Sequence, residues 1–143
     1  MASKNINDLY CLIASVIENC EIIPTAGNLP SYRELRSSPD KFYELFSEVT
    51  YKYNIICDAL QRLQYANAMI VKALNELMNP ESKEQFNVKS QYIKSFTNVK
   101  AECVALIAGY ETAKASAESI VKFYNAAQFT ITSNRFDATS ANY

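Results

Sequence analysis

The sequence has no histidine and no tryptophan, and only two of its 143 residues are glycines. Without histidine there is no Ser-His-Asp or Cys-His nucleophile, no histidine general base and no histidine metal ligand. Scarce glycine argues against phosphate-binding loops, Rossmann turns and β architectures with many tight turns. We therefore expect a mostly helical, non-enzymatic protein without a cofactor or a metal site.

Neither charge nor hydropathy points to nucleic acid or to a membrane. Fourteen Lys+Arg stand against 15 Asp+Glu, and the basic residues form no stripe of the kind that binds nucleic acid. Uninterrupted apolar runs are much shorter than the roughly 18 residues of a transmembrane helix. The apolar run 9–17 follows Asp8 and has helical spacing. We therefore interpret this run as a helix and not as a signal peptide.

The four cysteines form no CxxC pair, and their spacing indicates no disulfide framework. They are Cys11, Cys20, Cys57 and Cys103. Because histidine is absent, a zinc site would require all four thiols. The simpler interpretation is buried free thiols, which fits the cytoplasm or another reducing compartment.

Apolar residues at helical spacing predict a first helix over about 5–20. Its face consists of Ile6, Leu9, Ile13, Val16 and Cys20. Leu12 and Ile17 widen this face, so we expect burial along one broad side. The following segment holds three of the four prolines and Gly27, which predicts an irregular connector.

A second helix is predicted over 39–78, because apolar positions alternate at spacings of 4 and 3 for five heptads. This seam is Phe42, Phe46, Val49, Tyr53, Ile56, Leu60, Leu63, Asn67, Ile70, Leu74 and Leu77. Asn67, its one polar member, either fixes helix register and partner orientation or occupies a partly exposed position. The spacings of Glu48 to Lys52 and of Asp58 to Arg62 predict i,i+4 ion pairs.

A third helix is predicted over 80–127, with Asn79 as its cap and Pro80 in its first turn. Its seam is Tyr92, Phe96, Val99, Cys103, Leu106, Tyr110, Ala113, Ala117, Ile120, Tyr124 and Ala127. A short turn between two long helices requires them to be antiparallel neighbours. The predicted fold is all-α: a long antiparallel, coiled-coil-like helical hairpin with the shorter N-terminal helix packed against it as a helical bundle.

Small residues dominate the second half of the third helix, and they include Gly109. Glycine inside a helix costs about 1 kcal/mol relative to alanine, so we expect close packing against another helix, or a bend.

Segment 128–143 is rich in Thr, Ser and Asn, and Phe129 and Ile131 alternate with threonines. We expect one domain over 1–127, followed by an extended or flexible tail.

Three helices of unequal length leave apolar strips of the hairpin uncovered, and exposed strips of that size imply association. The sequence thus favours a structural or adaptor protein that acts through helix–helix contacts and self-associates into an oligomer or filament of scaffold or coat type. Candidate contact residues are Tyr53, Asn67, Gly109, Tyr110, Ala113, Ala117 and Tyr124; for the tyrosines, ordinary bundle packing is the alternative. A chaperone-like or inhibitory binder of another protein, or a binder of a small apolar ligand beside the Ala/Gly-rich half of the third helix, are the other hypotheses.

Overall fold

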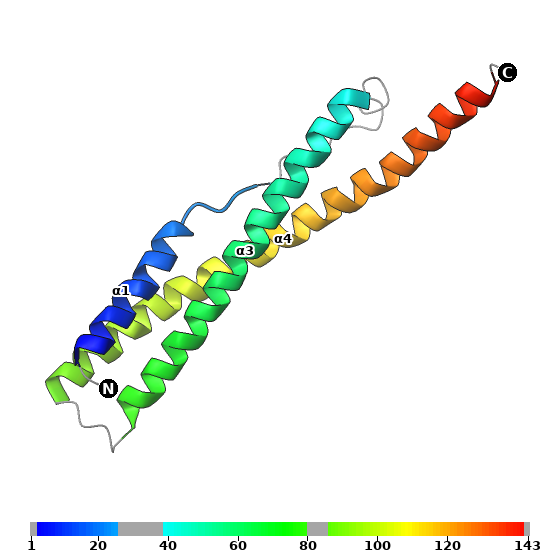
Figure 1. Cartoon of the computed structure of the whole chain (residues 1–143). Coiled ribbons are helices and arrows are strands. Elements are labelled where there is room, and N and C mark those ends of the chain that lie inside the picture. Colours follow the sequence, from blue (N-terminus) through cyan, green and yellow to red (C-terminus); the bar gives the residue numbers. More distant parts are fainter. Residues whose placement is uncertain (1–2, 26–38, 80–85, 142–143) are drawn as a thin grey trace. The chain divides into compact units, whose positions relative to one another are not determined.

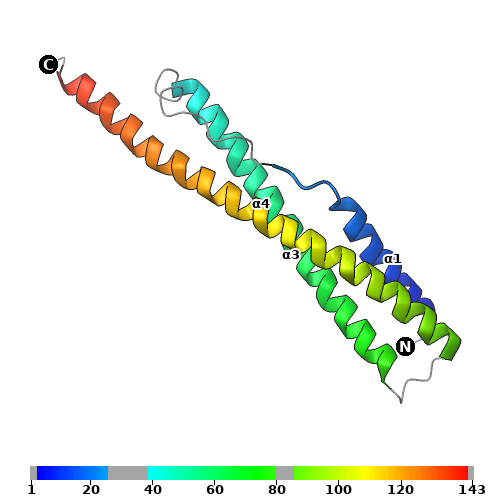
Figure 2. The same cartoon turned by 180° about the vertical axis from the view of Figure 1, so that it is seen from behind.

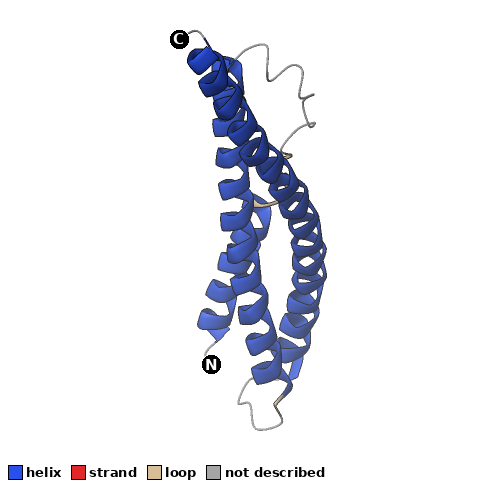
Figure 3. Cartoon of the chain, turned by 90° about the vertical axis from the view of Figure 1, so that its right-hand side faces the viewer, coloured by secondary structure: helices blue, strands red, loops and turns tan. Residues whose placement is uncertain are grey.

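The computed structural model describes residues 3–25, 39–79 and 86–141. This part of the chain forms three helices, α1 (Ser3–Asn19), α3 (Pro39–Met78) and α4 (Phe86–Ala141). The two long helices α3 and α4 pack antiparallel, and the shorter α1 packs against them (Figures 1 and 2). Figure 3 shows that the described residues are almost entirely helical, with only short stretches of loop beside the helix ends. The predicted all-α hairpin with a shorter N-terminal helix is confirmed.

The bounds predicted for the first and second helices agree with those of α1 and α3 within two residues. The bounds predicted for the third helix differ from those of α4. The start predicted for the third helix, at Pro80 with Asn79 as its cap, lies partly outside the described residues, which resume at Phe86. At its other end α4 continues to Ala141, so residues 128–141 are helical where an extended or flexible tail was predicted. Threonine, serine and asparagine have only moderately lower helix propensities than alanine. A helix that already exists extends through such residues without a new nucleation step.

Hydroxyl side chains occur within helices α3 and α4, where the hydroxyl group donates a hydrogen bond to the backbone carbonyl oxygen one turn earlier. The hydroxyl of Thr50 donates to the carbonyl of Phe46 at 2.9 Å, and that of Ser119 donates to the carbonyl of Ala115 at 3.2 Å. The hydroxyl-rich composition after residue 127 is therefore compatible with continued helix.

The chain divides into two compact units. Unit 1 comprises residues 1–23 and 57–111, and unit 2 comprises residues 24–56 and 112–143. Helix α1 and the second half of α3 belong to unit 1 with the first half of α4. Unit 2 holds the first half of α3 and the remainder of α4.

The core of unit 1 is formed by apolar side chains from all three helices. Its buried members are Ile6, Ile13, Ile17, Cys20, Leu60, Leu63, Ala66, Ile70, Ala73, Leu74, Leu77, Phe96, Val99, Cys103 and Tyr110. The rings of Tyr10 and Phe96 meet edge to face, with centroids 5.8 Å apart, and join α1 to α4. The thiol of Cys103 donates to the carbonyl oxygen of Leu63 at 3.3 Å and joins α4 to α3.

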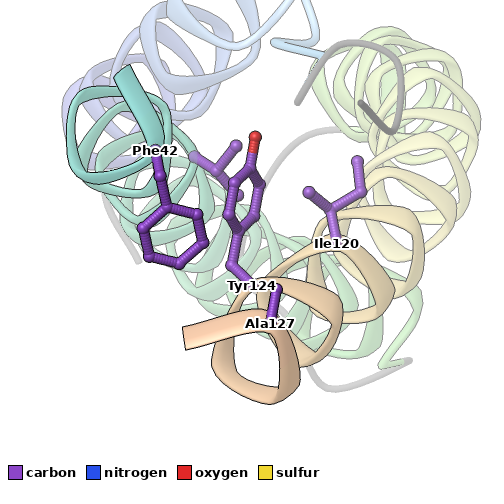
Figure 4. Close-up of a cluster of buried hydrophobic side chains, with 5 residues drawn as sticks. Phe42, Ile120, Tyr124 and Ala127 are labelled. Carbon is purple, nitrogen blue, oxygen red and sulfur yellow. The ribbon is translucent and has the colours of Figure 1, made fainter. Parts of the chain in front are cut away.

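The core of unit 2 is a cluster of Phe42, Val49, Ile120, Tyr124 and Ala127. In Figure 4 the ring of Tyr124 lies between Phe42 and Ile120. Its centroid is 5.6 Å from that of Phe42 and 5.5 Å from that of Phe46. Aromatic pairs at such distances contribute about 0.5–1.5 kcal/mol beyond the burial of their area. Among the described residues, this core is thus built from large rings on α3 and α4.

The heptad prediction is confirmed at the level of side-chain burial. No member of the seams predicted over 42–77 and 92–127 is exposed, and most are buried. The i,i+4 ion pairs are also present, with Glu48 and Lys52 at 3.2 Å and Asp58 and Arg62 at 3.0 Å. Three of these side chains are more than half exposed and Lys52 is 34% exposed, so the pairs contribute little to stability.

Candidate interaction surface

The structure distributes the seven predicted contact residues over both units. Unit 1 contains Asn67, Gly109 and Tyr110. Unit 2 contains the other four, which are Tyr53, Ala113, Ala117 and Tyr124. All seven side chains or positions are buried or half-buried. The contacts seen at these residues are therefore contacts within the chain.

Tyr110 of α4 forms hydrogen bonds with the backbone just after the end of α1. Its side chain is only 2% exposed, and its hydroxyl hydrogen is directed at two backbone carbonyl oxygens, those of Cys20 at 3.1 Å and Ile22 at 3.3 Å. Burial raises the pKa of the Tyr110 phenol, and the neighbouring Cys20 thiol adds to this rise. The phenol therefore remains protonated and serves as a hydrogen-bond donor.

Gly109 lies where the chain leaving α1 approaches α4. A Cβ atom at this position would be 2.5 Å from Cδ1 of Ile23, well inside van der Waals contact. The close approach predicted at Gly109 is present, but it is made by the side chain of Ile23 after the end of α1 and not by another helix. The sequence could not identify this partner, because Ile23 lies outside every periodic segment.

Two cysteines are buried beside these contacts. Cys20 and Cys103 are buried, whereas Cys57 is half-buried and Cys11 is exposed, and all four are free. Desolvation raises the pKa of the Cys20 thiol, and the Arg62 guanidinium opposes part of this rise. Burial also raises the pKa of the Cys103 thiol, with a smaller contribution from Cys20. The prediction of buried free thiols is thus confirmed for Cys20 and Cys103 and wrong for Cys11, which lies on the solvent side of α1.

The tyrosines of unit 2 connect α3 to α4. Tyr53 is half-buried, and its hydroxyl donates to Oε1 of Glu118 at 3.0 Å. Tyr124 is 2% exposed, and its pKa is raised by burial and further by the Glu48 carboxylate. Ala117 is fully buried and Ala113 is half-buried, as expected for small residues where helices pack closely.

Asn67 is the polar residue of the α3 seam. Its side chain is half-buried, and its Oδ1 atom is inaccessible to solvent and accepts no hydrogen bond. Leaving a buried acceptor unpaired costs about 1–3 kcal/mol. Such a cost is typical of an asparagine retained at a seam for register or orientation, and that role stays a prediction.

A surface feature that the sequence analysis missed is an apolar groove between α1 and α3 in unit 1. It consists of two depressions of about 420 Å³ and 380 Å³, which both include Tyr65 and Met69. The first is also lined by Leu9, Ala68, Lys72, Ala73 and Glu76, and the second by Leu12, Val16, Gln61, Arg62 and Ala66. We call this feature the α1–α3 groove.

Two large apolar side chains on the α1–α3 groove face solvent. Tyr65 is 67% exposed and Leu12 is 55% exposed. Burial was predicted along the broad face of the first helix; it is confirmed at Ile17 and wrong at Leu12. The spacing of Leu9, Leu12 and Val16 could have indicated this second face, since it repeats the 3 and 4 steps of a helical stripe.

Neither a metal site nor a membrane span is found in the part of the chain that the structure describes. Residues 3–25, 39–79 and 86–141 contain no group of three or more acidic or cysteine side chains arranged to hold a metal ion. Across the same residues, no helix combines the length and the apolar character needed to cross a membrane. Comparisons with protein families, with curated proteins and with solved structures find no match.

Proposed function

We propose that this protein is a non-enzymatic structural or adaptor protein that acts through helix–helix contacts and associates with further copies of itself. The observation that carries the proposal is the α1–α3 groove, where Tyr65 and Leu12 are more than half exposed beside an apolar floor. Burying a large apolar side chain contributes about 1.5–3 kcal/mol. A helix laid along the groove would therefore gain stability from both residues.

The pKa shifts in the described residues support a non-enzymatic role. The thiols of Cys20 and Cys103 and the phenols of Tyr110 and Tyr124 all have a raised pKa. A nucleophilic thiol requires the opposite shift, toward the thiolate. These four groups are held in the neutral form and pack or donate hydrogen bonds.

Binding of a different protein or of a small apolar ligand is the alternative for the same groove. The two depressions have volumes in the range of ligand pockets, and an amphipathic helix of a partner protein would use the same apolar floor. From the sequence, a ligand site is predicted beside the small residues of the third helix. There the side chain of Ile23 already occupies the space at Gly109.

Sedimentation equilibrium from micromolar to millimolar concentrations tests the proposal. We expect the average mass to rise with concentration and Tyr65→Gln to weaken this rise. Tyr51→Gln is a matched control, because Tyr51 lies on the same helix, outside the groove, and is 68% exposed against 67% for Tyr65. A constant monomer mass at every concentration would contradict self-association.

A further inference from the structure

Helix α3 carries a second stripe of side chains beside its buried seam. Arg62, Tyr65, Met69, Lys72 and Glu76 follow one another at spacings of 3, 4, 3 and 4, which places them along one side of the helix. All five line the α1–α3 groove. Four are exposed and Met69 is half-buried, so this stripe forms the accessible α3 wall of the groove.

Two opposite charges on this stripe, Arg62 and Glu76, lie at equal distances on either side of Met69. Arg62 precedes Met69 by seven residues and Glu76 follows it by seven, so each lies about 10.5 Å along the helix axis from Met69. If a second α3 helix ran antiparallel with its Met69 level with the first, Arg62 of each copy would lie level with Glu76 of the other. Arg62 and Glu76 of one copy are therefore complementary in charge to the same two residues of a second copy.

The same antiparallel register also matches side-chain sizes. It sets Tyr65 of one copy level with Ala73 of the other. Tyr65 is 67% exposed, whereas Ala73 is small and only 3% exposed. Ala73 lines the larger depression together with Ala68 and Leu9. This depression has a volume of about 420 Å³, which offers room for an aromatic ring.

Other arrangements of two α3 helices fit less well. A parallel pair in register, as two-fold symmetry requires, would set each charge against the same charge of the other copy. An antiparallel pair centred two residues earlier, at position 67, would set Arg62 against Lys72. Centring on Tyr65 would pair Asp58 with Lys72, but it would set two tyrosines level and leave Arg62 opposite Ala68.

We propose that a second copy of this chain occupies the α1–α3 groove in a two-fold symmetric dimer. The two α3 helices run antiparallel with Met69 at the axis, and Arg62 of each copy pairs with Glu76 of the other. This proposal rests on the proposed function and names the surface through which self-association occurs. A two-fold interface of this kind is closed, because each patch contacts an identical patch.

A charge exchange tests the dimer. We expect Arg62→Glu and Glu76→Arg, each alone, to raise the dimer Kd by at least about tenfold, because each places two pairs of like charges across the interface. The double variant Arg62→Glu/Glu76→Arg should return the Kd to within about threefold of the parent value, since the attraction is restored with exchanged partners. Kd is measured by sedimentation equilibrium, and circular dichroism establishes that each variant keeps its helices.

The restored affinity cannot arise within a single helix. Arg62 and Glu76 are 14 positions apart on α3, which is about 21 Å along its axis. Arg62→Glu also removes the ion pair with Asp58, and Asp58→Asn measures that loss separately. Lys94→Glu is a further control, because Lys94 is exposed on α4 and does not line the groove, so its Kd should stay unchanged.

The outcomes separate the interface from the broader proposal. Self-association of the parent protein together with unchanged Kd values for the single variants, or without recovery in the double variant, would overturn this interface and leave self-association standing. A parent protein that stays monomeric at millimolar concentration would overturn both. Weakening by each single variant with recovery in the double variant supports the antiparallel dimer.

Discussion

The hydroxyl of Tyr110 lies 3.1 Å from the carbonyl oxygen of Cys20, although 90 residues separate them in the sequence. This contact joins the middle of α4 to the end of α1, where the carbonyl groups of a helix have no partner within the helix. The same hydroxyl is 3.3 Å from the carbonyl oxygen of Ile22. One buried phenol therefore anchors the chain just where it leaves the helix.

Replacing Tyr110 with phenylalanine should lower the free energy of unfolding by about 1–2 kcal/mol. The ring remains in the core, but the carbonyl oxygens of Cys20 and Ile22 lose their donor, and a buried acceptor without a partner is costly. Urea unfolding followed by circular dichroism measures the change. Tyr51→Phe is the control, because Tyr51 is 68% exposed and its change should stay within about 0.5 kcal/mol. Equal effects of the two substitutions would show that the Tyr110 hydroxyl does not anchor α1.

Gly109 and Ile23 should be energetically coupled. Alanine is favoured over glycine inside a helix by about 1 kcal/mol, but its Cβ would lie 2.5 Å from Cδ1 of Ile23. Ile23→Val removes that methyl group. We therefore expect Gly109→Ala to stabilise the protein more in the Ile23→Val background than in the parent, with a coupling energy of about 0.5–1 kcal/mol. A double-mutant cycle in urea measures it, and strictly additive effects would contradict the contact.

Replacing Asn67 with leucine should raise the free energy of unfolding by about 1–2 kcal/mol. The substitution removes a buried Oδ1 acceptor that has no donor and adds apolar volume at a seam position. Thermal and urea unfolding provide the comparison. Asn54→Leu is the control, since Asn54 is exposed on the same helix. Destabilisation by Asn67→Leu, with no such effect of Asn54→Leu, would contradict this prediction. It would show that the Asn67 side chain stabilises the native state by more than the free-energy cost of its unpaired oxygen.

Stability should fall in alkaline solution. The pKa values of Cys20 and Cys103 are raised above 9.0, and those of Tyr110 and Tyr124 above 10.0, in each case chiefly by burial. A group with a raised folded-state pKa contributes its full stability below the unfolded pKa and loses it as pH rises through the folded pKa. Urea midpoints should therefore decline from about pH 9 upward.

The double variant Cys20→Ala/Cys103→Ala isolates the part of the alkaline decline that comes from the thiols. Its urea midpoint should fall less steeply than that of the parent between about pH 9 and 10, because of the four groups with a raised pKa only Tyr110 and Tyr124 remain. Cys11→Ala is the matched control, since Cys11 is exposed and its removal should leave the slope unchanged. A decline of equal slope in all three proteins would show that the buried thiols do not contribute to it.

The sequence alone determined the helical hairpin and the residues that it buries. Its signal was the unbroken alternation of 4 and 3 along both long helices, from Phe42 to Leu77 and from Tyr92 to Ala127. This periodicity follows from the local geometry of a helix, so it is readable without knowledge of any partner. The same local rule predicted the ion pair of Glu48 with Lys52.

Tertiary structure alone decided which side chains meet across the fold. The contact of Ile23 with Gly109 and the reach of Tyr110 to Cys20 join segments far apart in sequence, and no local pattern encodes them. The end of α4 at Ala141 was also beyond sequence reasoning, because the propensities of Thr, Ser and Asn are too weak to end an established helix. The α1–α3 groove exists only once two helices lie side by side, since the exposure of Leu12 and Tyr65 depends on what the neighbouring helix leaves uncovered.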